Sequence, residues 1–238
     1  PGTTQKVDSV VSHKRVEVAF CPERIAEGAA IHELRTIPQI IGTEVKQASH
    51  RLLELFGSLG VEIREMSWEE AELSKLILNT WRYCQFAIAN ELAVVCEHHG
   101  VDFSHIRDSM LYKYPRGQGL MSPGFAGGPC LRKDTLQLIA VSPPHAVFFP
   151  EVTASHDRVI TRVVNQVIQY TSNREMTVVQ LGISFKPCSD DLRGSVALEL
   201  ARELVTRVPR FIVVDPYVPI DFPEFTMMSI SEALECAD

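Results

Sequence analysis

The chain has 238 residues, of which 45% are hydrophobic, and its formal net charge is −7 at pH 7. It is long enough to bury the core of one large domain or of two small ones. Its acidic balance excludes a general nucleic-acid binder, which needs a basic face. No apolar run approaches the roughly 20 residues that cross a bilayer, so we expect no membrane partner either.

The cysteines indicate a reducing compartment. They are scattered and contain no CxxC pair, which is typical of a cytoplasmic protein rather than of a disulfide framework. The six are Cys21, Cys84, Cys96, Cys130, Cys188 and Cys236. Cys96 lies near His98 and His99, but no second ligand cluster has metal-site spacing, so we expect no metal.

The first part of the chain predicts βαβ units. We expect helices over 4–13 and 44–59 and strands over 16–20, 37–41 and 61–66. A strand, a helix and a strand at this spacing predict a parallel sheet. The sequence contains no GxGxxG, so the glycine turn of a dinucleotide-binding site is not among these residues.

A long helix follows. Ser67 and Glu70 form a capping box, and the helical pattern then continues to Glu97 without Gly or Pro. A helix of roughly 45 Å is too long for one small core, so we expect it to bridge domains or to pack in a homodimer. Lys75 and Asn79 are four residues apart and share one face of this helix. Spacing by itself favours an ordinary solvated lysine at position 75.

A shorter helix over 104–111 precedes a loop of small and turn-forming residues, 123–129, that leads directly to Cys130. Such a loop can bring a substrate close to backbone N–H groups and to the sulfur. Lys133 nearby would favour the thiolate, which is the form that attacks carbon. The alternative is an ordinary turn with a buried, inert cysteine. Composition alone leaves both interpretations of Cys130 open.

The last part of the chain predicts a second α/β domain. We expect a helix after Thr135 that stops at Ser142, a helix over 151–171, a further helix that follows Arg193 and continues to about Val208, and strands over 177–182 and 211–216. Domains of this kind bind ligands at the carboxyl ends of their strands. Asp215 lies at such an end, where it would either bind a ribose or cap a loop.

Four separated blocks follow one another along the chain. They are Cys21-Pro22-Glu23-Arg24 with Glu27, Lys75-x-x-x-Asn79 leading to Asn90-Glu91-Leu92, Gly127-Gly128-Pro129-Cys130-x-x-Lys133-Asp134, and Gly182-x-x-Phe185-Lys186 with Asp191-x-Arg193-x-Ser195. In this order and spacing the chain resembles the UDP-glucose/GDP-mannose dehydrogenases, the nucleotide-sugar 6-dehydrogenases. The resemblance covers nearly the whole chain.

The resemblance implies an α/β fold in three parts. These are the C-terminal part of an NAD-binding domain with a remnant of its Rossmann-like sheet (1–66), a central long-helix region for dimerisation and catalysis (67–175), and the start of a second Rossmann-like domain that binds UDP (176–238). Because the chain begins without Met and ends inside a predicted helix, we expect a fragment. Alone, it should neither bind NAD⁺ nor turn over.

The reaction implied by the family is a double oxidation of a sugar C6 alcohol to a carboxylate with NAD as cofactor. Cys130 would attack the aldehyde and carry the later thioester, while Lys75 and Asn79 would stabilise the oxyanion. Glu27 and Asp134 would handle protons, and the choice of hydrolytic base stays open. The resemblance further assigns substrate-binding roles to Glu23, Arg116, Phe125, Gly128, Lys186 and Arg193, and cofactor-binding roles to Glu27 and Lys133.

The block at 21–24 is closest to the UDP-N-acetylmannosamine branch of the family. We therefore expect a UDP-N-acetylhexosamine as the substrate, with UDP-glucose second and GDP-mannose third. Two departures are Gly194, where many relatives have Glu, and Val196, where many have Pro. A different class of function is an inactive dimerisation or binding module. A cysteine hydrolase is a third reading, but no His lies in a recognisable hydrolase motif.

Overall fold

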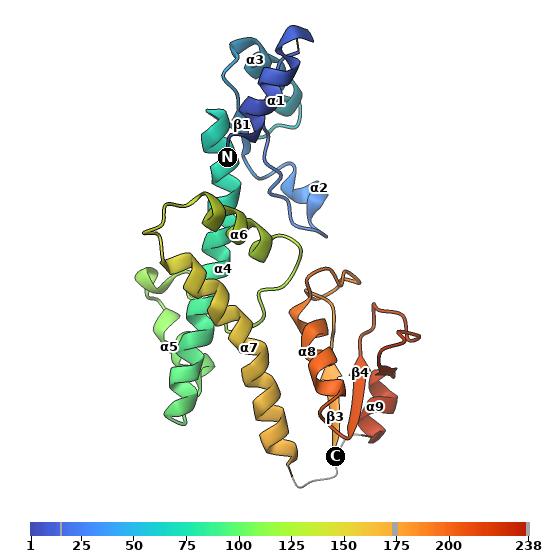
Figure 1. Ribbon diagram of the computed structural model, residues 1–238. Coiled ribbons are helices and arrows are strands. Elements are labelled where there is room, and N and C mark those ends of the chain that lie inside the picture. The colour runs from blue at the N-terminus through green and yellow to red at the C-terminus, as the bar shows by residue number, and fades with distance from the viewer. Residues whose placement is uncertain (15, 173–175, 237–238) are drawn as a thin grey trace. The chain divides into compact units, whose positions relative to one another are not determined.

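The computed structural model describes residues 1–14, 16–172 and 176–236 (Figure 1). Its parallel sheets and long central helix confirm the mixed α/β class. In chain order the elements are α1 (Thr3–Val11), η1 (Ser12–Lys14), α2 (Ala30–Glu33), β1 (Gln39–Gly42), α3 (Lys46–Gly57), β2 (Ile63–Met66), α4 (Trp68–His98), α5 (Phe103–Leu111), η2 (Pro115–Gly117), α6 (Leu131–Val141), α7 (Phe148–Thr171), β3 (Thr177–Leu181), α8 (Val196–Val205), β4 (Arg210–Val214), β5 (Thr226–Met227) and α9 (Ile230–Cys236). Within the described ranges, no helix combines the length and the apolar character that crossing a bilayer requires.

The chain forms two compact units, each built from two stretches of sequence. Unit 1 comprises Pro1–Thr80 with Asp134–Ser142, and unit 2 comprises Trp81–Lys133 with Pro143–Asp238. The predicted division into 1–66, 67–175 and 176–238 stays a prediction, and its second boundary falls beside residues 173–175, which lie outside the described residues.

Unit 1 contains the predicted βαβ arrangement. β1 and β2 pair in parallel, with Gln39 opposite Ile63, and α3 connects them. The carboxylate of Glu72 on α4 accepts hydrogen bonds from the backbone N–H of Thr4 at 2.7 Å and from its hydroxyl at 2.5 Å. The first backbone N–H groups of a helix have no acceptor within the helix. Glu72 therefore supplies an acceptor at the N-terminus of α1.

The predicted strand over 16–20 is wrong. Only Phe20 pairs with another strand, through an isolated antiparallel bridge to Gly42. The carbonyl of Val18 instead accepts hydrogen bonds from side chains, the indole of Trp68 at 3.2 Å and the hydroxyl of Thr43 at 3.4 Å. The segment over 16–20 therefore forms no ladder beyond this single bridge.

The capping box at the start of α4 is confirmed. The backbone N–H of Ser67 donates to Glu70 at 2.8 Å, and the N–H of Glu70 donates to the Ser67 hydroxyl at 3.2 Å. The helix that follows has 31 residues. Its start was predictable because both partners lie within one turn of the sequence.

The sheet of unit 2 is covered on both faces. β3, β4 and β5 are parallel, and α8 and α9 flank β4 (Figure 1). Successive residues of β4 alternate between the two faces: Phe211 and Val213 join the core that contains α8, whereas Ile212 and Val214 pack with Ala233 of α9. This alternation explains why the strand reads as a continuous apolar run.

Asp215, directly after β4, caps loops rather than lying free for a ribose. One carboxylate oxygen accepts from the N–H groups of Ile183 and Ser184, at 2.9 and 3.2 Å, and from the Ser184 hydroxyl at 3.1 Å. The other accepts from the N–H groups of Tyr217 and Val218, at 3.0 and 3.3 Å. Burial opposes ionisation of this carboxyl, but the hydrogen bonds outweigh it and lower the pKa of Asp215.

We predict that Asp215→Asn destabilises unit 2 by about 1–3 kcal/mol, because the amide places a donor against backbone donors that would lose their acceptor. Urea unfolding of chain and variant measures the difference. A carboxyl whose pKa is lower in the folded than in the unfolded state stabilises fully above the unfolded value, about 3.9, and loses this effect as the pH falls through the folded value. The difference should therefore narrow below about pH 4.

Asp221→Asn is the matched control, since Asp221 is an exposed carboxylate of the same unit. Its unfolding free energy should stay within about 0.5 kcal/mol of the parent chain. Equal stability of the Asp215 and Asp221 variants at pH 7 would contradict the assignment of Asp215 as a loop cap.

Candidate active site

Cys130 is exposed and directly precedes α6. The interpretation of this residue as a buried, inert cysteine is therefore wrong. The helix begins at Leu131 rather than after Thr135, and Asp134 lies in its first turn, where a carboxylate interacts favourably with the helix dipole. Cys130 is thus the residue directly before the N-terminus of α6.

Residues 123–129, which lead to Cys130, are called the cysteine loop below. The start of this loop is fixed by a side-chain amide. Asn90 on α4 is 3% exposed. Its Nδ2 donates to the carbonyl of Gly124 at 2.9 Å, and its Oδ1 accepts from the N–H of Gly124 at 2.8 Å. A buried amide that satisfies both backbone groups of one residue holds it much as a neighbouring strand would.

The end of the cysteine loop is fixed by the loop before α8. The N–H of Gly128 donates to the carbonyl of Gly194 at 2.8 Å. Phe185 covers Gly128, since a Cβ built on that glycine would lie 2.7 Å from the ring. The loop that carries Cys130 is therefore held at both ends within unit 2.

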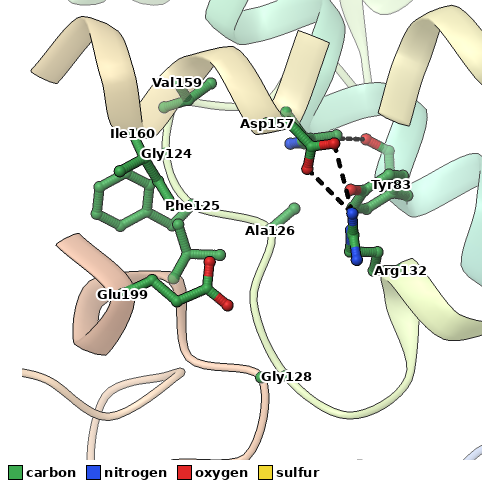
Figure 2. A pocket seen from close by; sticks show the side chains of 13 residues that line it. Tyr83, Gly124, Phe125, Ala126, Gly128, Arg132, Asp157, Val159, Ile160 and Glu199 are labelled. Carbon is green, nitrogen blue, oxygen red and sulfur yellow. Dashed lines mark hydrogen bonds and ion pairs between the residues drawn. The ribbon is translucent and has the colours of Figure 1, made fainter. Parts of the chain in front are cut away.

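A cavity of about 210 Å³ lies beside this loop, as Figure 2 shows. Arg132 is directed toward Asp157, and Glu199 on α8 lies across the cavity. The lining residues are Tyr83, Gly124, Phe125, Ala126, Gly128, Arg132, His156, Asp157, Val159, Ile160, Gly194, Val196 and Glu199.

The wall of this cavity on α4 and α7 is aromatic and polar. The rings of Tyr83 and His156 stack with their centroids 3.8 Å apart, and Nε2 of His156 lies 2.9 Å from the carbonyl of Tyr83. Burial raises the pKa of Tyr83 to about 12 and lowers that of His156. Both side chains are therefore neutral at pH 7, and the charge on this side comes from Arg132 and Asp157, which are paired at 3.2 Å.

Unit 1 brings two of the predicted site residues together. The amide of Asn79 on α4 donates to the carboxylate of Asp134 on α6 at 2.6 Å. Asp134 is 3% exposed, and Lys75, one turn before Asn79 on the same helix, is half-buried. The bond orients the Asn79 amide and uses one of its two N–H donors, so that the second N–H and the carbonyl oxygen can serve other partners.

The two glutamates of the first block lie elsewhere in unit 1. Glu23 is exposed and accepts from the N–H of Ile25 at 2.6 Å, and Glu27 is exposed as well. Lys133, the other residue assigned to the cofactor, is exposed in unit 2. Among the described residues no group of three or more His, Cys, Asp or Glu side chains could hold a metal ion.

Unit 2 holds the remaining predicted binding residues. Arg116 donates to the hydroxyl of Tyr114 at 2.9 Å and lies 4.8 Å from the centre of its ring. Arg193 forms an ion pair with Asp191 at 2.6 Å, and the hydrogen bonds from Arg193 lower the pKa of Asp191 to about 2. The Lys186 ammonium lies 5.4 Å from the centre of the Phe185 ring.

Phe125 and Lys186 both line a second cavity, of about 500 Å³, at the carboxyl ends of β3 and β4. Asp215 and Tyr217, which follow the end of β4, line the same cavity. The position agrees with the rule that such sheets bind ligands beyond the carboxyl ends of their strands.

Sequence reasoning missed the roles of Asn90 and Gly194. The sequence names Asn90 only within the block Asn90-Glu91-Leu92. Nothing local indicates that this side chain binds a loop 34 residues away. Gly194 was noted as a departure from the family, and its positive φ of 61° explains the glycine.

Comparisons with known proteins identify relatives of this chain. Residues 69–158 match the model of the UDP-glucose/GDP-mannose dehydrogenase family, central domain. The chain is 30% identical over 231 residues to an NDP-N-acetyl-D-galactosaminuronic acid dehydrogenase of Ralstonia solanacearum, with 94% of this chain and 54% of the relative covered. It is 30% identical over 241 residues to the UDP-N-acetyl-D-mannosamine dehydrogenase of Escherichia coli K12, covering 94% of this chain and 56% of the relative.

Solved structures of the same kind share the fold. A UDP-D-ManNAc dehydrogenase from Pyrococcus horikoshii is 26% identical with a TM-score of 0.87, over 100% of this chain and 59% of that one. A UDP-glucose dehydrogenase from Pyrobaculum islandicum is 28% identical with a TM-score of 0.84, over 98% of this chain and 58% of that one. The chain spans about half the length of the curated relatives it matches. Residues 69–158 thus match the central domain of the UDP-glucose/GDP-mannose dehydrogenase family, and over 94% of its length the chain is similar to nucleotide-sugar dehydrogenases.

Proposed function

We propose that the protein that contains this chain oxidises the C6 alcohol of a nucleotide sugar to a carboxylate, with Cys130 as the nucleophile. The observation that carries the proposal is the exposed sulfur at the N-terminus of α6, on a loop held at both ends by Asn90 and Gly194. A fixed loop places a nucleophile without the entropy cost of ordering it during the reaction.

The proposed chemistry at Cys130 has two parts. The thiolate adds to the C6 aldehyde, so that a C–S bond forms and the carbonyl oxygen takes the negative charge. After oxidation of this adduct to a thioester, water attacks the thioester carbonyl, the C–S bond breaks, and the carboxylate and the thiolate are released. The N-terminus of α6 stabilises the sulfur anion at the start and at the end.

NAD⁺, the oxidant of this family, would accept a hydride in each of the two oxidations. Among the described residues 1–14, 16–172 and 176–236, no strand-to-helix turn carries GxGxxG, the glycine turn typical of a dinucleotide site. Glu27 and Lys133, which the resemblance assigns to the cofactor, belong to different compact units. The roles below are therefore those of this chain's side chains alone.

Lys75 and Asn79 are proposed to stabilise the oxyanion, as an ammonium and an amide donor. Asp134 holds the Asn79 amide through the bond at 2.6 Å, so it would act as a positioning residue for Asn79. Glu27 and Asp134 are the proposed proton carriers, and Glu23 is proposed to contact the sugar.

The nucleotide half of the substrate is proposed to bind unit 2. Lys186 lines the cavity of about 500 Å³ beyond β3 and β4 and would contact a diphosphate as a point charge. Arg193 would have to exchange its carboxylate partner Asp191 for the ligand. Phe125, Gly128 and Arg116 complete the proposed set, with the sugar next to the cysteine loop.

A UDP-N-acetylhexosamine is the proposed sugar nucleotide. Two relatives that are 30% identical over 94% of this chain are named for N-acetylated hexosamine or hexosaminuronic acid chemistry. UDP-glucose is the alternative, since a UDP-glucose 6-dehydrogenase of Bacillus subtilis is 26% identical. The ratio of kcat/KM for the two sugar nucleotides distinguishes them.

We predict that Cys130→Ala in the complete dehydrogenase lowers acid formation by more than about 10³-fold, because the thioester can no longer form. Binding of the sugar nucleotide, followed by calorimetry, should stay within about threefold. Cys236→Ala, which removes an exposed thiol on α9, is the control and should keep full activity. NADH production by Cys130→Ala near the parent rate would exclude this cysteine as nucleophile.

For Asn79→Ala we predict a loss in kcat of roughly 10²- to 10³-fold with a much smaller change in KM, as for other oxyanion donors. Steady-state kinetics separates the two parameters. Gln137→Ala removes an exposed amide from α6 and should leave both unchanged. A kcat within threefold of the parent enzyme would remove Asn79 from the proposed machinery.

A homodimer through α4 is also proposed. Trp81, Ile88, Leu92 and Val95 are exposed at 57%, 43%, 40% and 55%, and their spacing is that of one apolar stripe on a helix. Other apolar residues of α4, namely Leu76, Tyr83 and Ala87, are buried within the chain. The stripe is also what the alternative function, an inactive dimerisation module, would use.

We predict that the chain has a dimeric mass in light scattering at micromolar concentration, and that Ile88→Asp with Leu92→Asp makes it monomeric, since two charges would be buried unpaired. Leu234→Asp, at an exposed apolar residue on α9, should remain dimeric. A monomeric parent chain would contradict the proposed interface.

A further inference from the structure

Three glycines meet where the cysteine loop contacts the loop before α8. The hydrogen bond of 2.8 Å from the N–H of Gly128 to the carbonyl of Gly194 brings the two backbones together. Gly128 and Gly194 have positive φ values of 97° and 61°, a region that L side chains rarely adopt. Gly127 lies at the same contact.

A side chain at Gly194 or Gly127 would press against the backbone that faces it. A Cβ built on Gly194 would lie 3.0 Å from the carbonyl oxygen of Gly128 and 3.2 Å from its carbonyl carbon. A Cβ on Gly127 would lie 3.2 Å from the carbonyl oxygen of Gly194. Backbone atoms, unlike the end of a long side chain, cannot move aside without shifting the loop.

The Gly194 side of the contact is stiff. The hydroxyl of Ser195 is buried, donates to the carbonyl of Ile183 at 2.6 Å and caps α8 by accepting from the N–H of Leu198 at 3.2 Å. The N–H of Phe185 donates to the carbonyl of Asp191 at 3.1 Å. This loop is therefore a fixed support on which the Cys130 loop can lie.

On the other side of the contact, Gly128 is two residues before Cys130 in the sequence. Only Pro129 separates Gly128 from Cys130, and proline fixes its own φ near −65°. Pro129 therefore has only one free backbone torsion, ψ, with which to absorb a shift of Gly128 before it reaches Cys130.

We propose that Gly194 and Phe185 are positioning residues for Cys130: through Gly128 they hold the sulfur at the N-terminus of α6. The importance of this position for catalysis rests on the proposed function. The position itself does not, because it governs the reaction of the sulfur with any electrophile.

The test is the rate of alkylation of Cys130 by iodoacetamide in the 238-residue chain, followed by peptide mass spectrometry with Cys236 as the internal reference. Gly194→Ala should slow the reaction at Cys130 by about 2- to 5-fold at fixed pH, which is the size of a helix-terminus effect on a charge. Hydrogen exchange in the peptide that contains Gly128 should become faster, because its amide loses its acceptor.

Gly100→Ala is the matched control. Gly100 also belongs to unit 2 and has a positive φ of 67°, but a Cβ there meets nothing within 4 Å. It imposes the same backbone strain without the contact, so alkylation and exchange should match the parent chain. Equal rates in Gly194→Ala and Gly100→Ala would overturn the proposal.

Phe185→Ala tests the same idea without a strained backbone, in case Gly194→Ala does not fold by circular dichroism. It should give faster exchange at Gly128 and slower alkylation of Cys130, and parent values for both would overturn the proposal. In the complete dehydrogenase, Gly194→Ala should lower kcat at least about fivefold while KM for the sugar nucleotide stays within twofold. If Cys130→Ala proved active, the proposed function would fail while the alkylation and exchange results would still decide the positioning.

Discussion

The carboxylate of Asp215 fixes the start of the loop before α8, and this loop holds one end of the cysteine loop. Its two oxygens collect donors from Ile183, Ser184, Tyr217 and Val218, and so join the ends of β3 and β4. A buried carboxylate is stable there only because hydrogen bonds replace its water. The bonds to Ile183 and Ser184 thereby hold the first residues of the loop before α8.

The cysteine loop itself has no regular secondary structure between Gly124 and Gly128. Its order comes from two different kinds of anchor, a side-chain amide at Asn90 and a backbone carbonyl at Gly194. One anchor lies on the long helix and the other next to the second sheet. Irregular backbone that is held at both ends can present N–H groups that a helix or a strand would pair internally. It can present a cysteine sulfur beside them.

The sequence predicted what is local and missed what is long-range. The capping box of Ser67 and Glu70 and the parallel pairing of β1 with β2 followed from spacing within one helix turn or one βαβ unit. The strand over 16–20 failed because side chains of Thr43 and Trp68 take the acceptor that a ladder would need. The exposure of Cys130 and the role of Asp215 depend on how distant segments meet, which periodicity does not encode. The roles of Lys75 and Glu27 came from the resemblance alone.

The division of the chain has a consequence for synthesis on the ribosome. Unit 1 needs Asp134–Ser142 as well as Pro1–Thr80, and unit 2 supplies the 53 residues between these stretches. Because a domain completes its folding only when its last segment has emerged, the N-terminal stretch must wait for α6, with β1, β2 and α3 already outside the exit tunnel. Neither unit can be produced by cutting the chain at a single point.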